Sequence, residues 1–197
     1  MSNSRRFKPS EAHRLEDPER LLWLPPGDVL ALLPLRPGMR VADIGAGTGY
    51  FALPIAREIG PSGRVLAVDV EPEMIARLKQ KIESAGAPQN IELIEGEATN
   101  TRLPAAQVDL LLMANLWHEL DDLEGALREA NRLLHEGGRL AILDWRPDVD
   151  RPPGPPLEHR IPPAEVKEFL ESHGWRVERS SQVGRYSYFL LAVSPSS

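Results

Sequence analysis

The chain has 197 residues, of which 42% are hydrophobic and 26% are charged, values typical of an ordinary globular protein. Its 29 acidic and 23 basic residues give a formal net charge of -6, which argues against nucleic acid as a partner, because nucleic-acid binders concentrate positive charge. The absence of cysteine excludes disulfides, thiolate nucleophiles and cysteine metal sites. No apolar run reaches the ~18–20 residues of a membrane span, and the first twenty residues lack the apolar core of a secretory signal. We therefore expect a cytoplasmic protein.

Two short helices are predicted in the lead-in, which is the segment before the first strand. Residues 17–19 (Asp-Pro-Glu) favour a helix start, because Asp caps, Pro fits the first turn and Glu suits the positive helix end. The first helix then covers residues 20–24 and the second starts at Asp28. The apolar segment 21–24 is interpreted as part of a lid over a site, with a membrane-docking surface as the alternative.

From residue 40 onward, short apolar runs alternate with helical patterns. The runs predicted to be strands are 41–44, 65–68, 91–94, 108–113 and 140–143. Apolar residues at helical spacing predict helices over 51–59, 74–82 and 123–134, and Gly137-Gly138 is predicted to end the last of these. Continuous apolar strands that alternate with helices indicate a parallel sheet covered on both faces.

The end of the chain has a different pattern. Seven of the nineteen prolines lie in 147–163, which predicts a loop, and a helix follows over 164–173. Two β-rich runs, 175–183 and 186–193, are separated only by Gly184-Arg185, a link short enough for a hairpin but not for a parallel crossover. We expect an α/β fold with five parallel strands and a C-terminal antiparallel hairpin, in one domain. Its parts are the lead-in (1–37), a ligand-binding core (38–146), the proline-rich loop (147–163) and the helix with the hairpin (164–197).

A glycine-rich loop follows the first predicted strand, in residues 41–50 (VADIGAGTGY). Glycines at alternate positions allow sharp turns and a close approach of the backbone to a ligand, at the carboxyl end of the strand where open α/β sheets bind cofactors. Dinucleotide folds use G-x-G-x-x-G/A, but the sixth position here is Tyr50. Asp43, two residues before the first glycine, would repel a pyrophosphate. A glycine turn without a ligand is the alternative.

This spacing resembles motif I (h-h-D-h-G-x-G-x-G) of the class I S-adenosylmethionine-dependent methyltransferases. Asp69, twenty residues after Gly49, stands where that family places the acid that binds the ribose hydroxyls. An NAD ribose is bound in the same way, and a helix-capping role before Pro72 is a further alternative. The resemblance also implies that Met74 lies beside the adenine, whereas its spacing with Leu78 equally fits core packing.

Further segments extend the resemblance over residues 38–146. Gly96-Glu97-Ala98 is similar to the family's G-D-A, with Glu in place of the Asp that accepts a hydrogen bond from the adenine amino group. Segment 113–120 (MANLWHEL) corresponds to the part that lines the methionine half of the cofactor and faces the acceptor, and 133–140 matches the turn into strand five. The resemblance implies a Rossmann-like doubly wound sheet with the order 3-2-1-4-5-7-6 and S-adenosyl-L-methionine as the cofactor. The implied cofactor-binding residues are Asp43, Gly45, Ala46, Gly47, Gly49, Asp69, Val70, Met74, Glu97, Ala98 and Asn115.

The whole chain also resembles a group of small bacterial and archaeal methyltransferases related to quinone- and arsenite-methylating enzymes. The shared features are F-x-P-S-x-x-x-x-L-E-D-P-x-R (7–20), W-H-E-L (117–120) and D-W-R (144–146) followed by G-P-P. The absence of cysteine argues against an arsenite acceptor, and residues 115–118 lack the proline pair of DNA adenine methylases. A quinone ring, a small phenol, an amine or a thiol remain as acceptors.

His118 is the candidate catalytic residue, because it follows the fourth strand closely and a histidine near neutral pKa accepts a proton from a phenol or an amine. Packing beside Trp117 or a bond to Glu119 is the alternative. The other histidines lack metal-ligand spacing to His118, so no metal site is expected. Arg146 and Arg160 flank the proline-rich loop and are either ligands of an anionic acceptor or solvated.

The function expected from these features is in-line transfer of the sulfonium methyl group to a small-molecule acceptor. Two alternatives stay open. A nicotinamide-dependent reductase is disfavoured by Tyr50 and by the lack of a Tyr-x-x-x-Lys pair, and a non-catalytic cofactor-binding subunit has no sequence feature against it. Neither the acceptor nor the oligomeric state follows from the sequence.

Overall fold

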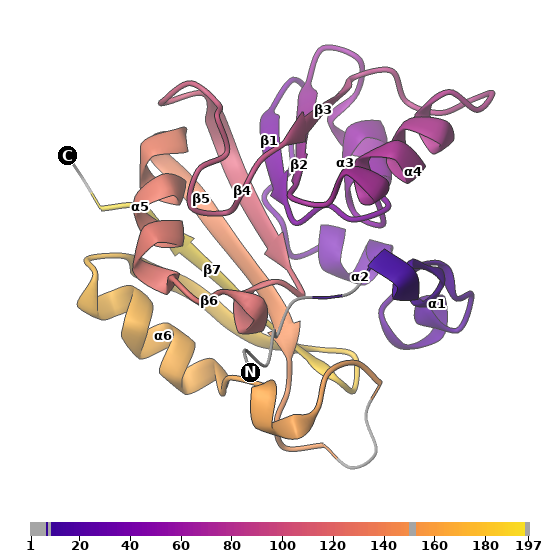
Figure 1. Ribbon diagram of the computed structural model, residues 1–197. Helices are drawn as coiled ribbons and strands as arrows, with labels where there is room; N and C mark the ends of the chain where they lie inside the picture. The colour runs from indigo at the N-terminus through magenta and orange to yellow at the C-terminus, as the bar shows by residue number, and fades with distance from the viewer. Residues whose placement is uncertain (1–6, 8, 150–152, 196–197) are drawn as a thin grey trace.

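A seven-stranded sheet with the order β3-β2-β1-β4-β5-β7-β6 forms the centre of the protein, in a computed structural model that describes residues 7, 9–149 and 153–195 (Figure 1). Strands β1 to β5 are parallel, and β7 is antiparallel to both β5 and β6. This confirms the predicted fold class and strand order. The strands are β1 (Arg40–Ile44), β2 (Arg64–Asp69), β3 (Ile91–Glu95), β4 (Val108–Ala114), β5 (Leu134–Trp145), β6 (Arg176–Val183) and β7 (Ser187–Val193).

Helices cover both faces of the sheet because neighbouring strand residues point to opposite sides. On β1, Ala42 and Ile44 pack in one apolar cluster together with residues of α5 and α6. Val41 packs in a second cluster with residues of α2 and α3. The α-helices are α1 (Arg20–Trp23), α2 (Pro26–Leu30), α3 (Ala52–Ile59), α4 (Pro72–Ile82), α5 (Leu123–Leu133) and α6 (Pro163–Ser172), and the 3-10 helices are η1 (Pro9–Glu16), η2 (Trp117–Glu119) and η3 (Leu157–His159).

The structure differs from the sequence predictions in several local details. Helix α2 begins at Pro26 rather than at Asp28, because proline is favourable in the first helical turn. The lead-in also contains η1, which no apolar periodicity predicted. The prediction that Gly137-Gly138 ends the preceding helix is wrong: α5 ends at Leu133 and both glycines lie within β5. The pairing register of β5 with β4 shifts there, and such irregularities favour glycine.

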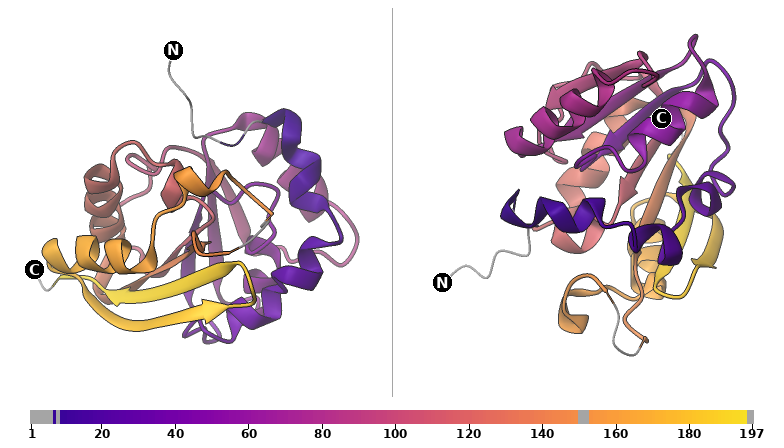
Figure 2. Two further views of the ribbon diagram at one scale, coloured as in Figure 1. Left: turned by 90° about the horizontal axis from the view of Figure 1, so that it is seen from below. Right: turned by 90° about the vertical axis from the view of Figure 1, so that its right-hand side faces the viewer.

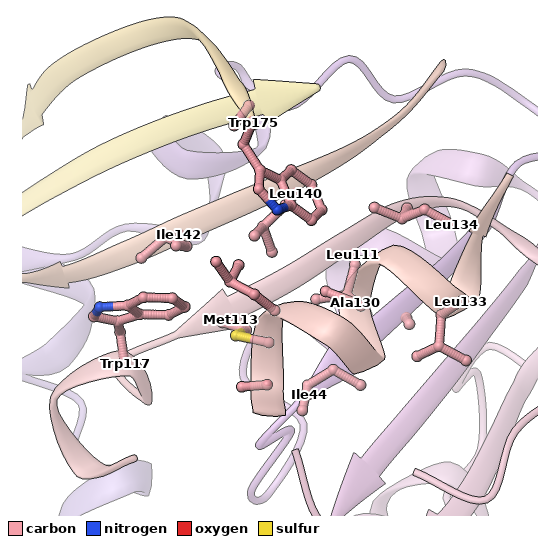
Figure 3. Packing of buried hydrophobic residues seen from close by; sticks show 14 of the residues in the cluster. Ile44, Leu111, Met113, Trp117, Ala130, Leu133, Leu134, Leu140, Ile142 and Trp175 are labelled. Carbon is pink, nitrogen blue, oxygen red and sulfur yellow. The ribbon is translucent and has the colours of Figure 1, made fainter. Parts of the chain in front are cut away.

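Trp117 anchors the loop that follows β4. Its side chain is fully buried and lies in the same apolar cluster as Met113 and Ile142 (Figure 3). It also contacts Phe169 of α6 edge to face, with ring centroids 5.9 Å apart. Burial of such a large aromatic side chain contributes strongly to packing, so Trp117 anchors η2 at the end of β4.

The lead-in is joined to the rest of the protein by aromatic contacts. Trp23 lies 5.2 Å from Trp145 and 6.4 Å from Tyr186, measured between ring centroids. Figure 2 shows the lead-in, drawn in indigo, close to the orange segment that follows β5. Leu24 is fully buried, whereas Leu22 is 83% exposed. Only one side of the segment 20–24 therefore packs against the rest of the protein.

Candidate functional site

A cavity lies at the carboxyl ends of β1, β2 and β4, where open α/β sheets bind their ligands. The loops after these strands and the lead-in line it. Ten of the predicted cofactor-binding residues are among the lining residues: Asp43, Gly45, Ala46, Gly47, Asp69, Val70, Met74, Glu97, Ala98 and Asn115. The sequence motifs, which span more than seventy residues, therefore meet at one site.

The glycine-rich loop turns at the mouth of this cavity. Gly45 and Gly47 have φ angles of +72° and +54°, in the left-handed region that glycine adopts at little cost. Gly49 has a different position: it does not line the cavity, and a Cβ atom there would collide with the side chain of Leu78. The third glycine of the motif thus lets the loop pack against α4 and does not face the ligand space.

Asp69 ends β2 and connects the two neighbouring loops. Its Oδ2 atom accepts a hydrogen bond of 2.7 Å from the amide of Gly47, and Oδ1 accepts one of 2.9 Å from the amide of Glu71. Burial raises the pKa of Asp69, and these two amide bonds oppose the rise. The carboxylate is 8% exposed and lines the cavity, so it orders the loops and also faces the ligand space.

Asp43 is a buried acid near the end of β1. It is 2% exposed, and its Oδ2 atom has no hydrogen-bond partner among the described residues. Burial, followed by the nearby charge of Asp69, raises the pKa of Asp43 to about 7. A cationic ligand group in the cavity would favour the ionised carboxylate.

The loop after β4 supplies a second unpartnered polar atom. Asn115 has a φ of +55°, a conformation that asparagine tolerates better than most residues. Its Oδ1 atom is buried and has no hydrogen-bond partner among the described residues. Such an atom is costly to bury unless a ligand or water pairs with it. Glu97, in the loop after β3, also lines the cavity but its side chain is largely exposed.

His118 lies behind the cavity rather than on its wall. Its Nδ1 atom donates to Oδ1 of Asp144 at 2.7 Å, and its Nε2 atom lies 3.7 Å from Oε1 of Glu119. Burial lowers the pKa of His118, but the two carboxylates raise it by more. His118 is not among the residues that line the cavity, and its ring is bonded to Asp144 of β5. Its catalytic role stays a prediction.

Glu119, the residue after His118, does lie on the cavity wall. It lines the cavity, and its Oε2 atom accepts a hydrogen bond of 2.9 Å from the amide of Phe7. Burial raises the pKa of Glu119 to about 7, and the charge of His118 opposes the rise. At neutral pH this carboxyl group is therefore poised to gain or lose a proton.

Arg20 and Tyr50 are among the lining residues that the sequence does not assign to the site. The Arg20 guanidinium carbon lies 3.8 Å from the centre of the Tyr50 ring. In the sequence, Tyr50 only breaks the dinucleotide motif, and Arg20 only belongs to the lead-in pattern. No local signal links the two, because they lie thirty residues apart.

The two arginines beside the proline-rich loop do not reach the cavity. Arg146 pairs with the exposed Asp148 at 2.7 Å. Arg160 is buried and donates hydrogen bonds to the backbone carbonyls of Arg146 and Pro155. Neither lines the cavity. Arg160 thus holds the loop together, and a role in acceptor binding is not supported for either residue.

Known proteins resemble this chain in sequence and in structure. A family described as a methyltransferase domain matches residues 41–138. A solved S-adenosylmethionine-dependent methyltransferase from Aquifex aeolicus is 34% identical, with a TM-score of 0.90, over 95% of this chain and 99% of that one. The "Ubiquinone/menaquinone biosynthesis C-methyltransferase UbiE" of Vibrio vulnificus is 30% identical over 59% of this chain and 45% of its own. Its counterpart in Ectopseudomonas mendocina is 27% identical over 82% of this chain and 61% of its own.

The chain thus spans about half the length of the curated relatives it matches. Its match to the Aquifex aeolicus protein, by contrast, covers nearly all of both chains. The strand order, the glycine-rich loop and the acid at the end of β2 agree with this relationship. The chain belongs to the class I S-adenosylmethionine-dependent methyltransferases and is related to the quinone methylases.

Proposed function

We propose that this protein transfers the methyl group of S-adenosylmethionine to a small-molecule acceptor. The observation that carries this proposal is the cavity in which the glycine-rich loop, Asp43 and Asp69 meet. When bound, S-adenosylmethionine supplies an electrophilic methyl group on a sulfonium. The protein contributes orientation of the two reactants and exclusion of water.

The residues of the cavity fit the chemistry of this cofactor. Asp69 offers a buried carboxylate for the ribose hydroxyls, and Met74 is an apolar residue for the adenine ring. Asp43 and Asn115 each present a buried oxygen atom without a hydrogen-bond partner among the described residues, suited to the ammonium group. Glu97 is the proposed acceptor for the adenine amino group. The acidic lining also disfavours a pyrophosphate, and with it the nicotinamide-dependent alternative.

A proton must leave the acceptor when its accepting atom is a hydroxyl, an amine or a carbon acid. We assign the acceptance of this proton to Glu119, because it lines the cavity whereas His118 does not. His118 lies between Glu119 and Asp144, with Nε2 toward the first and Nδ1 toward the second. It is therefore a positioning residue that stabilises the charge of Glu119.

The charge of the chain and the names of its relatives support a small-molecule acceptor. The net charge of -6 supports a small molecule rather than a nucleic acid. The curated relatives carry names that refer to ubiquinone and menaquinone biosynthesis, so hydroxylated aromatic rings are the first class to test. Small phenols, amines and thiols complete the set.

Two measurements test this function. Isothermal titration should show binding of S-adenosylhomocysteine in the micromolar range, about -8 kcal/mol, and no binding of NAD or NADP. Incubation with methyl-labelled S-adenosylmethionine and pools of small molecules should then transfer the label to an acceptor. The Asp69→Ala variant, tested in parallel at the same concentrations, should transfer much less label. Tighter binding of NAD than of S-adenosylhomocysteine would refute the proposal.

A further inference from the structure

Arg20 carries a buried positive charge that the described part of the chain leaves largely unpaired. Its side chain lines the cavity, and the residue is only 6% exposed. Among the described residues, its guanidinium donates one hydrogen bond, of 3.3 Å, to the carbonyl of Leu15, and the buried Nε atom has no partner. No carboxylate of the described residues lies within 4.0 Å of the guanidinium, in contrast to the ion pairs of the surface arginines. A buried charge without a partner is costly.

The lead-in holds Arg20 firmly in place over the glycine-rich loop. The side chain of Leu15 comes within 3.4 Å of the position that a Cβ atom on Gly47 would take. Lys81 of α4 pairs with Glu16 at 2.9 Å and also donates to the carbonyl of Thr48 at 2.9 Å. These contacts place the lead-in against the loop, so Arg20 is part of the wall of the cavity.

Tyr50 fixes the plane of the guanidinium. The Tyr50 hydroxyl donates a hydrogen bond of 2.6 Å to the carbonyl of Leu24, one turn beyond Arg20. The ring then lies under the Arg20 guanidinium at 3.8 Å. Stacking of this kind stabilises a cation while leaving the edge of the guanidinium free for an anion.

Asp43 is the counterpart of Arg20 in the same cavity, with the opposite charge. It too is buried and has an oxygen atom without a partner among the described residues. A ligand that brings one anionic and one cationic group would satisfy both residues at once. The amino-acid end of S-adenosylmethionine is such a zwitterion, and its carboxylate is the only anionic group of the molecule.

We propose that Arg20 binds the carboxylate of the cofactor, so that the lead-in forms part of the cofactor site. This inference rests on the proposed function and extends it. Residues 9–35 lie outside the region that the family model matches, residues 41–138, so membership of the family does not by itself assign the role. The lead-in thereby selects ligands that keep the amino-acid end over nucleosides that lack it.

Two ligands and two variants test the assignment. S-adenosylhomocysteine has the carboxylate, whereas 5′-methylthioadenosine has the same adenine, ribose and thioether but no amino-acid end. The variants are Arg20→Met, which removes the charge, and Arg14→Met, which removes an exposed arginine of the same segment. In isothermal titration, Arg20→Met should weaken S-adenosylhomocysteine binding by about 10–150-fold, because it loses a charge-assisted hydrogen bond. The same variant should bind methylthioadenosine as tightly as the wild type does. Arg14→Met should change neither affinity.

Two other results would overturn the role of Arg20 in carboxylate binding. An equal loss of both ligands in Arg20→Met would show a structural role for Arg20 and overturn the inference, as would unchanged binding of S-adenosylhomocysteine. Thermal unfolding gives a second measure: the ligand-induced rise in the unfolding midpoint should shrink for S-adenosylhomocysteine only. Should Arg20→Met fail to fold, Arg20→Lys keeps the charge and loses the planar contact, and the same ligand-selective loss is expected. A wild-type protein that binds neither ligand would refute the proposed function as well.

Discussion

The carboxylate of Asp144 holds both the ring and the backbone of His118. Nδ1 of His118 donates to Oδ1 at 2.7 Å, and the backbone amide of His118 donates to Oδ2 at 2.9 Å. Both residues are almost fully buried, at 3% and 1% exposure. A single acid at the end of β5 therefore fixes the loop that follows β4, and with it the position of Glu119 on the cavity wall.

The first prediction concerns this pair. Asp144→Asn should lower the pKa of His118, because burial, which lowers it, is then no longer outweighed by the carboxylate. A raised histidine pKa stabilises the fold below the unfolded-state value near 6.5, and this contribution is lost as pH rises through the folded-state value. The loss of unfolding free energy in Asp144→Asn should thus be larger at pH 6 than at pH 9. At pH 6 it should reach about 3–5 kcal/mol, the usual cost of breaking a buried ion pair.

Histidine NMR titration and denaturant unfolding at both pH values measure these effects. The matched control is Asp109→Asn, which disrupts the exposed pair of Asp109 with His135, 2.8 Å apart. That change should cost about 1 kcal/mol or less, because exposed ion pairs contribute little. An unaltered pKa of His118 in Asp144→Asn would argue against the coupling.

A second prediction separates the role of Glu119 from that of His118. With an acceptor in hand, Glu119→Gln should reduce kcat by about 10²–10⁴-fold, the usual contribution of a general base, and leave S-adenosylhomocysteine affinity unchanged. Because the pKa of Glu119 is about 7, the wild-type rate should rise with pH through this value, and the variant should lose that rise. His118→Gln should shift the midpoint of the pH profile without abolishing it.

The control for this series is Asp121→Asn, which changes an exposed acid two residues further along the loop. It should keep both kcat and the pH profile of the wild type. A Glu119→Gln variant with the wild-type pH profile would exclude Glu119 as the proton acceptor.

A third prediction tests Asp69. If its carboxylate binds the ribose hydroxyls, Asp69→Ala loses charge-assisted hydrogen bonds worth about 1.5–3 kcal/mol, and cofactor affinity falls about 10–150-fold. A purely helix-capping role instead predicts a stability loss of about 1 kcal/mol with little change in binding. Titration and thermal unfolding on the same variant distinguish the two. Glu73→Ala, an exposed acid in the first turn of α4, should leave binding unchanged.

The fourth prediction is a pH dependence set by Asp43. An acid whose pKa is raised to about 7 in the folded chain binds its proton more tightly there than when unfolded. Its contribution to stability therefore falls as pH rises from the unfolded-state value, about 4, through 7. Without ligand, Asp43→Asn should have the same unfolding midpoint as the wild type near pH 4. At pH 8 the midpoint of the variant should be higher by a few degrees, since a stability difference of 1 kcal/mol corresponds to about 2–4 °C.

The same Asp43→Asn variant should bind S-adenosylhomocysteine more weakly, because the ammonium group loses its ionic partner. Gain of stability together with loss of binding is the expected signature of a residue retained for its ligand. A difference between the two midpoints that stays constant from pH 4 to pH 8 would contradict the raised pKa.

Local patterns in the sequence determined the sheet and the glycine-rich loop. Buried parallel strands are recognisable as continuous apolar runs, and the short link 184–186 allows only an antiparallel pairing of β6 with β7. The loop was predictable because its glycines are required by their own backbone or by close neighbours. Gly45, Gly47 and Gly49 all have positive φ angles, and Gly49 also packs against Leu78. These are short-range constraints, so they can be recognised from neighbouring residues in the sequence.

Only the tertiary structure decided which side chains face the ligand. Whether His118 or Glu119 points into the cavity depends on how η2 turns, and that turn is set by Trp117 in the core and by Asp144, twenty-six residues away. Arg20 reaches the cavity because the lead-in packs over the loop that carries Tyr50. Such contacts join residues far apart in the chain, and their strength comes from burial and charge in the folded state. The composition of the chain and the spacing of its residues do not reveal this burial or this charge environment.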